Sequence, residues 1–264
     1  MAQSSAEAMA TSVNQAFQEF KSRLEITDPQ TSTVSTRQQS VRDVVAAEMD
    51  VKDSFLSGSY SRSTLIAPLS EADIDVFVVL DARYYWHYNG QNGGQAGLLD
   101  LLKSTLRKTY TRTPDISRNG QAVTIEFEDF SVDVVPAFFR QGGGFLIPNS
   151  ITHSWLETDP KKHIDIFANA NAAHNGMLVP MIKMIKAWNR SLGKHFRSFH
   201  LEVLALAIYD NVTISNYWSG MRFFLDKGRA IIAVKNPDPA GYGDDVGRYI
   251  SGQAKIDEAI GKFQ

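Results

Sequence analysis

The segment IDVFVVL, at residues 74–80, constrains the fold most strongly. An uninterrupted run of branched and aromatic residues of this length is typical of a buried strand. Two further strands are predicted nearby. In AVTIEFE, Val123 and Ile125 alternate with Thr124 and Glu126, and residues 130–136 form another apolar run. Leucines at helical spacing between residues 98 and 106 predict a helix. The first half of the chain therefore predicts a sheet flanked by helices.

Helices are predicted at both ends of the chain. Val13, Phe17 and Leu24 fall at helical spacing, ITDPQTST breaks the pattern, and Ser35 or Thr36 caps a second helix that runs to about Met49. Four further helices are expected at residues 161–173, 177–192, 199–210 and 252–263. The predicted class is α+β, with residues 1–155 as a sheet lobe carrying an N-terminal helical spine and residues 156–264 as a helical lobe. A cleft between the two lobes is expected.

Composition excludes several classes of protein. Twenty-seven basic residues against 29 acidic ones lack the basic excess of a permanent nucleic-acid binder. The absence of cysteine excludes disulfides and thiolate zinc sites. MAQSSAEAMA is not a secretory signal, and no apolar run approaches the roughly 20 residues of a membrane helix. We expect a cytoplasmic protein, and the helical pattern at the C-terminus leaves open that this end is trimmed.

Three aspartates carry the candidate chemistry. Asp73 and Asp75 lie two residues apart where a strand begins, so both point to one face, roughly 6–7 Å apart. Asp133 lies on another short strand, and pairing of the two strands would bring it beside them. Carboxylate oxygens of this kind bind Mg²⁺. Alone, an Asp-x-Asp is usually a solvated strand end, but here Gly58-Ser59 precedes it, and a Gly-Ser turn lets the backbone approach a phosphate.

The segment GSYSRSTLIAPLSEADIDVFVVL resembles the signature of the cGAS/DncV-like nucleotidyltransferases, members of the DNA polymerase β-like superfamily. FSVDVVPAF, WLETDPKKH, MIKMIKAWNR and SFHLEVLAL agree with the same family, so the likeness covers roughly residues 30–250. Enzymes of this family make cyclic oligonucleotide second messengers in bacterial anti-phage (CBASS) systems. The resemblance implies a polymerase β-like nucleotidyltransferase lobe packed on a helical lobe, with the active site in the cleft.

The resemblance also implies a reaction. Two Mg²⁺ or Mn²⁺ ions would be held by Asp73 and Asp75, with Asp133 completing the site of the ion that activates the acceptor hydroxyl. ATP, GTP or UTP would be joined into a cyclic di- or trinucleotide with release of pyrophosphate. The product would diffuse to a downstream effector in the bacterial cytoplasm. No stable nucleic-acid or membrane partner is expected, and the chain is expected to be a monomer.

Other residues are assigned to the nucleotide by resemblance. Lys183, Lys186 and Arg190 share one helix face, which by itself indicates a solvated basic face. The family suggests that Lys186 contacts the triphosphate. Ser198 is a helix N-cap, a phosphate ligand or both, and Phe199 either packs in the core or stacks on the base. Arg62 and Thr64, in the loop after Gly58-Ser59, are weaker candidates for phosphate contact.

Three other functions remain open at this stage. An RNA-tailing enzyme of the poly(A) or CCA type, or a synthase of linear oligonucleotides, would use the same carboxylates, but RNA binding needs more basic contacts. A minimal nucleotidyltransferase that modifies protein or tRNA would be shorter. A catalytically inactive module is disfavoured because all three carboxylates and Gly58-Ser59 are present.

Glu126 and Glu128 are lower-ranked alternatives to Asp133. There is no Cys/His zinc insertion, so direct activation by double-stranded DNA is not expected.

Overall fold

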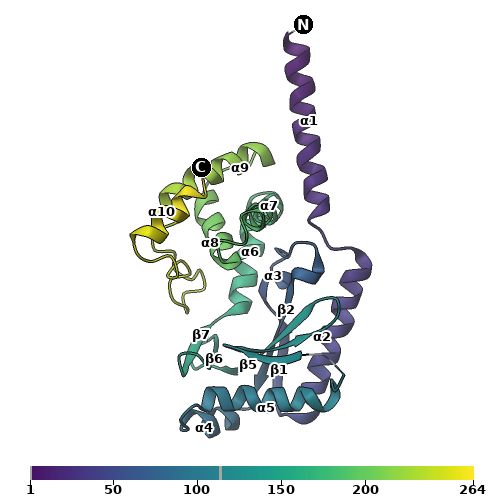
Figure 1. Cartoon of the computed structure of the whole chain (residues 1–264), viewed down its shortest axis with the longest axis vertical. Coiled ribbons are helices and arrows are strands. Elements are labelled where there is room, and N and C mark those ends of the chain that lie inside the picture. The colour runs from purple at the N-terminus through teal and green to yellow at the C-terminus, as the bar shows by residue number, and fades with distance from the viewer. Residues whose placement is uncertain (1, 113–114) are drawn as a thin grey trace. The chain divides into compact units, whose positions relative to one another are not determined.

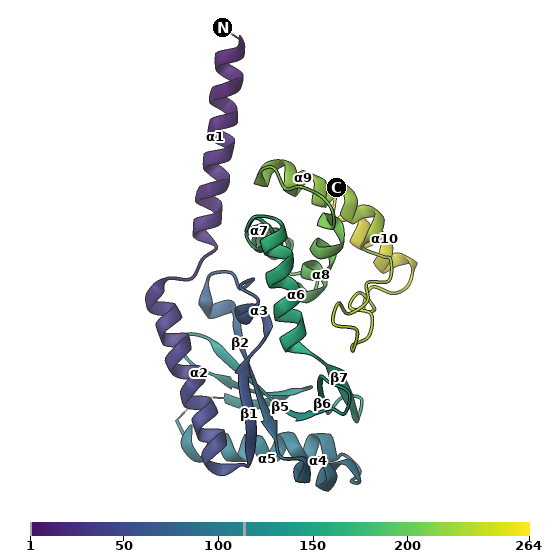
Figure 2. The same ribbon diagram turned by 180° about the vertical axis from the view of Figure 1, so that it is seen from behind.

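A computed structural model describes residues 2–112 and 115–264. Contacts within the chain divide it into two compact units. The sheet unit comprises Ile26–Arg62 and Ala67–Ile164, and the helical unit comprises the residues up to Glu25, Ser63–Ile66 and Asp165–Gln264. Figures 1 and 2 label the helices and strands of both units.

A mixed sheet forms the centre of the sheet unit. The strand order is β1-β2-β5-β4-β3, β6 pairs with β5, and β7 pairs with β6. The β2–β5 pair is parallel, and the other pairs are antiparallel. The predicted α+β class is confirmed. The strands are β1 (Val51–Leu56), β2 (Asp73–Leu80), β3 (Asp115–Asn119), β4 (Ala122–Glu126), β5 (Ser131–Phe139), β6 (Phe145–Asn149) and β7 (Ser154–Thr158).

Both faces of the sheet are covered within this unit. The helices are α2 (Asp28–Glu48), the single turn α3 (Gly58–Ser61), α4 (Ala82–Asn89) and α5 (Gly94–Thr109). Helices α2 and α5 pack against each other and against the strands (Figure 1). On β2, Ile74, Val76 and Val78 are fully buried, and the alternating Phe77 and Val79 belong to a separate apolar cluster with β5 and β6. Burial from two sides explains why β2 is apolar from Val76 to Leu80.

The second helix begins earlier than predicted. Helix α2 starts at Asp28, because Thr27 and Gln30 form a capping box and Pro29 lies in the first turn, where proline is tolerated. The break between the first two helices is therefore confined to a few residues around Ile26. Ser35 and Thr36, the predicted caps, lie inside α2.

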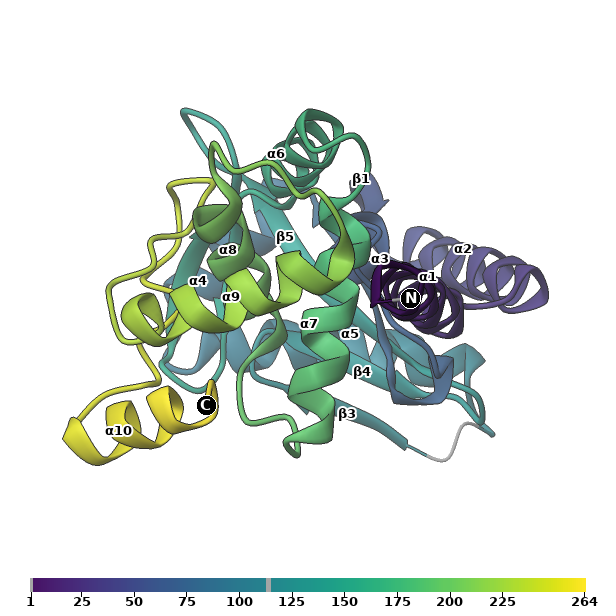
Figure 3. The same cartoon turned by 90° about the horizontal axis from the view of Figure 1, so that it is seen from above.

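Helices build the helical unit, and Figure 3 labels them. They are α1 (Ala2–Arg23), α7 (Leu178–Ser191), α8 (Ser198–Tyr209), α9 (Tyr217–Ile231) and α10 (Gln253–Gly261), and the unit boundary falls within α6 (Pro160–Ala173). Sequence analysis missed α9, which Asn216 caps. Two glycines interrupt its pattern because their bare backbones press against Met181 and Phe263.

The grouping of contacts differs from the expected division at residue 155. It places the boundary nine residues further on, within α6, and assigns α1 to the helical unit rather than to the sheet lobe. The reason is packing, because Leu24 is part of the core of the helical unit and Phe17 and Phe20 pack against it. In the described ranges, none of the helices is long and apolar enough to cross a membrane.

Candidate active site

The three predicted aspartates share one face of the sheet. In the parallel β2–β5 pair, Asp75 lies opposite Asp133, and Asp73 lies opposite Ser131. Because side chains alternate along a strand, all three carboxylates point to the same side as Phe77, away from α2 and α5. Asp73 is exposed, and the other two are half-buried. The pairing of two strands far apart in the sequence therefore produces a local concentration of negative charge.

A tight turn brings Gly58 against this cluster. The backbone N–H of Ser57 donates to the carbonyl oxygen of Asp75 over 2.9 Å, which fixes the start of α3 beside β2. Gly58 has a positive φ of 66°. A Cβ atom at this position would overlap with the carboxylate of Asp75. Glycine is thus required both for the backbone conformation and for the close approach to a predicted site residue.

Gly58→Ala is expected to cost more than an ordinary glycine substitution at positive φ. Gly93 in the same unit has a φ of 73° and open space where a Cβ would lie, so Gly93→Ala carries only the backbone cost of about 1 kcal/mol. The overlap with Asp75 should add about 1–3 kcal/mol for Gly58→Ala. Urea unfolding of the two variants measures the difference, and equal losses would contradict the close approach.

Asp133 is held by a residue that sequence analysis did not single out. Thr124 on β4 lies opposite Asp133, and its hydroxyl donates to Oδ1 of Asp133 over 2.5 Å. Burial raises the pKa of Asp133 above its ordinary value, and the hydrogen bond from Thr124 opposes this shift. The strict alternation of AVTIEFE, which puts Thr124 on the polar face, was the signal for it.

The donor chemistry of this face fits a hard divalent cation. Carboxylate oxygens are the ligands that Mg²⁺ and Mn²⁺ take, and three of them on one face repel one another unless a cation compensates. In the described part of the chain, no three His, Cys, Asp or Glu side chains are already gathered at metal-binding distances. The three carboxylates are thus suitable ligands on one face of the sheet, and their side chains would have to move closer together to bind one ion.

The predicted basic face on α7 is not solvated. Lys183 and Lys186 are each only 7% exposed. Nζ of Lys186 lies 3.2 Å from Oε1 of Glu202 and donates to the carbonyl oxygen of Thr64 over 2.8 Å. Thr64 is itself fully buried, which leaves no surface for the phosphate contact that its position suggested. The interpretation of this face as a solvated basic stripe is therefore wrong.

Ser198 and Phe199 begin α8 in the helical unit. Ser198 is exposed and is the first residue of the helix, whereas the N-cap is Arg197, which makes no side-chain cap bond. The cap interpretation of Ser198 is therefore wrong. Phe199 is half-buried against the core, with its ring centroid 6.5 Å from that of Phe167. The sequence-predicted residues thus fall into two groups, one in each unit.

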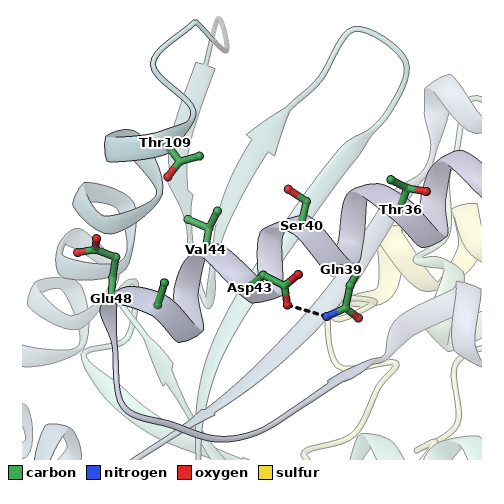
Figure 4. A pocket seen from close by; sticks show the side chains of 8 residues that line it. Thr36, Gln39, Ser40, Asp43, Val44, Glu48 and Thr109 are labelled. Atoms are coloured by element: carbon green, nitrogen blue, oxygen red, sulfur yellow. Dashed lines mark hydrogen bonds between the residues drawn. The ribbon is translucent and has the colours of Figure 1, made fainter.

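A pocket on the sheet unit contains none of the predicted residues. It lies along α2 and the end of α5 (Figure 4). Hydroxyl, amide and acidic side chains line most of it, and Nε2 of Gln39 donates to Asp43 over 2.8 Å. Its lining residues are Thr36, Gln39, Ser40, Asp43, Val44, Ala47, Glu48 and Thr109. The carboxylate face, not this pocket, is therefore the candidate active site.

Comparison with known sequences identifies the family of the chain. Residues 11–171, well over half of the chain, match the Second Messenger Oligonucleotide or Dinucleotide Synthetase (SMODS) domain family. The chain is 29% identical over 217 residues to a cyclic AMP-AMP-AMP synthase of Acinetobacter, a match that covers 76% of this chain and 60% of the relative. It is 25% identical over 222 residues to a probable cyclic nucleotide synthase of Bacillus cereus, covering 72% and 66%. The matches thus span less than two thirds of these relatives.

Solved structures share the fold. Escherichia coli MS115-1 CdnC, determined with ATP, superposes with a TM-score of 0.75 at 21% identity, over 94% of this chain and 88% of that one. The dinucleotide cyclase DncV of Vibrio cholerae superposes with a TM-score of 0.72 at 14% identity, over 92% and 85%. Both results support the polymerase β-like architecture that the sequence indicated.

Proposed function

The chain belongs to the Second Messenger Oligonucleotide or Dinucleotide Synthetase family, and we propose that it joins nucleoside triphosphates into a cyclic oligonucleotide and releases pyrophosphate. The observation that carries the proposal is the pairing of Asp75 with Asp133 across β2 and β5, with Gly58 against Asp75. One relative is named a cyclic AMP-AMP-AMP synthase, so ATP is the first substrate to test. The product is proposed to act on a separate effector in the bacterial cytoplasm during anti-phage defence.

Each carboxylate has a separate proposed role. Asp73 and Asp75 would hold one Mg²⁺ or Mn²⁺ ion, which would neutralise triphosphate charge. The same pair together with Asp133 would hold a second ion, which would lower the pKa of the acceptor hydroxyl. Thr124 keeps the carboxylate of Asp133 oriented through its hydrogen bond. The absence of a side chain at residue 58 lets the backbone of the Gly58-Ser59 turn lie directly against the carboxylate of Asp75, and we propose that this turn contacts the triphosphate.

Residues of the helical unit are assigned by family resemblance. We propose that Ser198 contacts the triphosphate and that Phe199, whose ring is half-buried, stacks on a nucleobase. The same resemblance assigns Lys186 to the triphosphate. Its bonds to Glu202 and Thr64 support a different role.

A product assay tests the proposed function. The protein is incubated with Mg²⁺ or Mn²⁺ and ATP, and separately with all four nucleoside triphosphates. The mixture is then treated with phosphatase and analysed by mass spectrometry. A phosphatase-resistant cyclic product is the expected result, and its mass reports base composition and ring size. Linear products that retain a phosphatase-sensitive end would contradict cyclisation.

RNA tailing is the alternative function. It uses the same carboxylate chemistry but needs an RNA acceptor, for which the balanced charge of the chain offers little electrostatic affinity. The same assay is therefore repeated with a short single-stranded RNA. Extension of the RNA, with no cyclic product in its absence, would favour the alternative.

A further inference from the structure

One short segment of the helical unit interrupts the part of the chain that carries the predicted residues of the sheet unit. Ser63–Ile66 lies in the sequence between Gly58-Ser59 and Asp73, yet its contacts assign it to the helical unit. Leu65 is 5% exposed, and Ile66 packs against the core of the helical unit. The conformation of this segment therefore depends on contacts within the helical unit.

Two features show that the segment is held in a specific conformation. Ser63 has a φ of 60°, a left-handed conformation that non-glycine residues adopt at an energetic cost. Such a conformation persists only where surrounding bonds impose it. The carbonyl oxygen of the next residue, Thr64, accepts a hydrogen bond from Nζ of Lys186 over 2.8 Å. A charged donor makes this bond stronger than one between neutral groups.

Lys186 is in turn held by Glu202 on α8. Glu202 is fully buried, and its Oε1 lies 3.2 Å from Nζ of Lys186. Removing one member of a buried ion pair leaves the other charge uncompensated, which is strongly unfavourable. Lys186 therefore cannot move away from Thr64 without giving up its ion pair with the buried carboxylate of Glu202.

A second lysine on α7 provides a comparison. Nζ of Lys183 lies 2.5 Å from Oε2 of Glu25, one turn of the helix away from Lys186. The side chain of Glu25 is 46% exposed, unlike that of Glu202. The two lysines thus hold different segments, Lys183 the residue that follows α1 and Lys186 the segment around Thr64.

We propose that Glu202 and Lys186 are positioning residues that fix Ser63–Ile66 and thereby the loop that joins Gly58-Ser59 to Asp73 and Asp75. Glu202 holds Lys186, and Lys186 holds the Thr64 carbonyl. Neither residue needs to touch a nucleotide for this role. The catalytic part of the inference rests on the proposed nucleotidyl transfer, whereas the bond network can be tested in the protein without substrate.

Hydrogen exchange followed by mass spectrometry tests the network directly. Glu202→Gln and Lys186→Met should each accelerate exchange in peptides covering residues 61–70 by at least about 10-fold. Lys183→Met is the matched control, because it removes a neighbouring buried lysine of α7 and should leave these peptides unchanged. If Glu202→Gln does not fold, Glu202→Asp, which keeps the charge but shortens the side chain, takes its place with the same expected local acceleration.

The double variant Lys186→Met/Glu202→Gln separates positioning from general stability. It buries no uncompensated charge, so its melting temperature should exceed that of Lys186→Met. The peptides covering residues 61–70 should nevertheless remain fast, because the donor to Thr64 is missing. Unchanged exchange of these peptides in the double variant, or equal acceleration in Lys183→Met, would overturn the proposal.

Steady-state kinetics test the catalytic consequence. For Glu202→Gln we expect a fall in kcat of about 10-fold with KM for ATP changed by less than about 3-fold, as for a residue that orders the site. A rise in KM with unchanged kcat would instead assign Lys186 to direct triphosphate binding. If the wild-type protein forms no product, the proposed function fails, while the exchange experiment still decides whether the network holds the segment.

Discussion

Replacing Asp75 or Asp133 by asparagine is expected to lower formation of the cyclic product by at least about 1000-fold. Each change keeps the shape of the side chain but removes a negative charge from the face that β2 and β5 share. Asparagine cannot replace a carboxylate as a charged ligand of a hard cation. The rate is measured as the pyrophosphate released in the presence of Mg²⁺, with the product identified by mass spectrometry.

Glu128→Gln is the matched control for the two aspartate variants. Glu128 is an exposed carboxylate in the turn after β4, and its neutralisation should leave the rate within about 2-fold of wild type. Loss of activity in Glu128→Gln with full activity in Asp133→Asn would reverse the assignment of the third carboxylate. Binding of Mn²⁺ gives a readout independent of turnover, because the ion should raise the melting temperature of the wild type more than that of Asp133→Asn.

The helical unit is expected to lose stability as the pH falls from 6.5 to about 4. His200 on α8 is 1% exposed, and burial lowers its pKa from 6.5 to about 4. This net value includes the charge of Asp245, which raises the pKa of His200, and a smaller effect of Arg197, which lowers it. Nε2 of His200 lies 3.2 Å from Nδ2 of Asn236, whose amide donates, so the neutral ring serves as the acceptor.

The direction of the pH effect follows from these values. Above pH 6.5 the imidazole is neutral in the folded and the unfolded chain. Below pH 6.5 the unfolded chain binds a proton that the folded chain does not, and this difference grows until the folded pKa of about 4 is reached. The resulting decrease in the free energy of unfolding is about 3 kcal/mol at most. Urea unfolding across this pH range measures it.

His200→Gln is the informative variant for this prediction. Glutamine can accept from Asn236 and donate to the hydroxyl of Tyr249, which lies 3.0 Å from Nδ1 of His200, but it does not titrate. Between pH 6.5 and 4, the free energy of unfolding of His200→Gln should therefore fall by about 3 kcal/mol less than that of the wild type. His87→Gln, at an exposed position on α4, is the control and should reproduce the wild-type profile. Parallel profiles for wild type and His200→Gln would contradict the prediction.

Local patterns predicted most of the elements that position the carboxylates. The apolar run at residues 74–80 and the alternation in AVTIEFE correspond to β2 and β4, because burial and strand geometry act on consecutive residues. Sequence patterns did not predict an element where the residues that pack against it are distant in the sequence. Helix α9 was missed because its glycines make room for Met181 and Phe263, residues that lie far from them in the sequence.

Charged residues were the least predictable from sequence. The spacing of Lys183, Lys186 and Arg190 indicates one face of a helix but not whether that face is solvated. Burial of Lys186 depends on Glu202 and on the carbonyl of Thr64, the latter 122 residues away. The start of α2 was also misplaced, because a capping box at Thr27 was read as part of a break.

The sequence by itself determined the chemical identity of the candidate site. Strand alternation alone places Asp73 and Asp75 on one face, and Gly58-Ser59 precedes them by a short loop. Only the tertiary structure decided which residues join them. The parallel pairing of β2 with β5 sets Asp133 opposite Asp75 and Thr124 beside Asp133. Strand register and burial depend on the whole fold, because each is fixed by contacts between residues that the sequence keeps far apart.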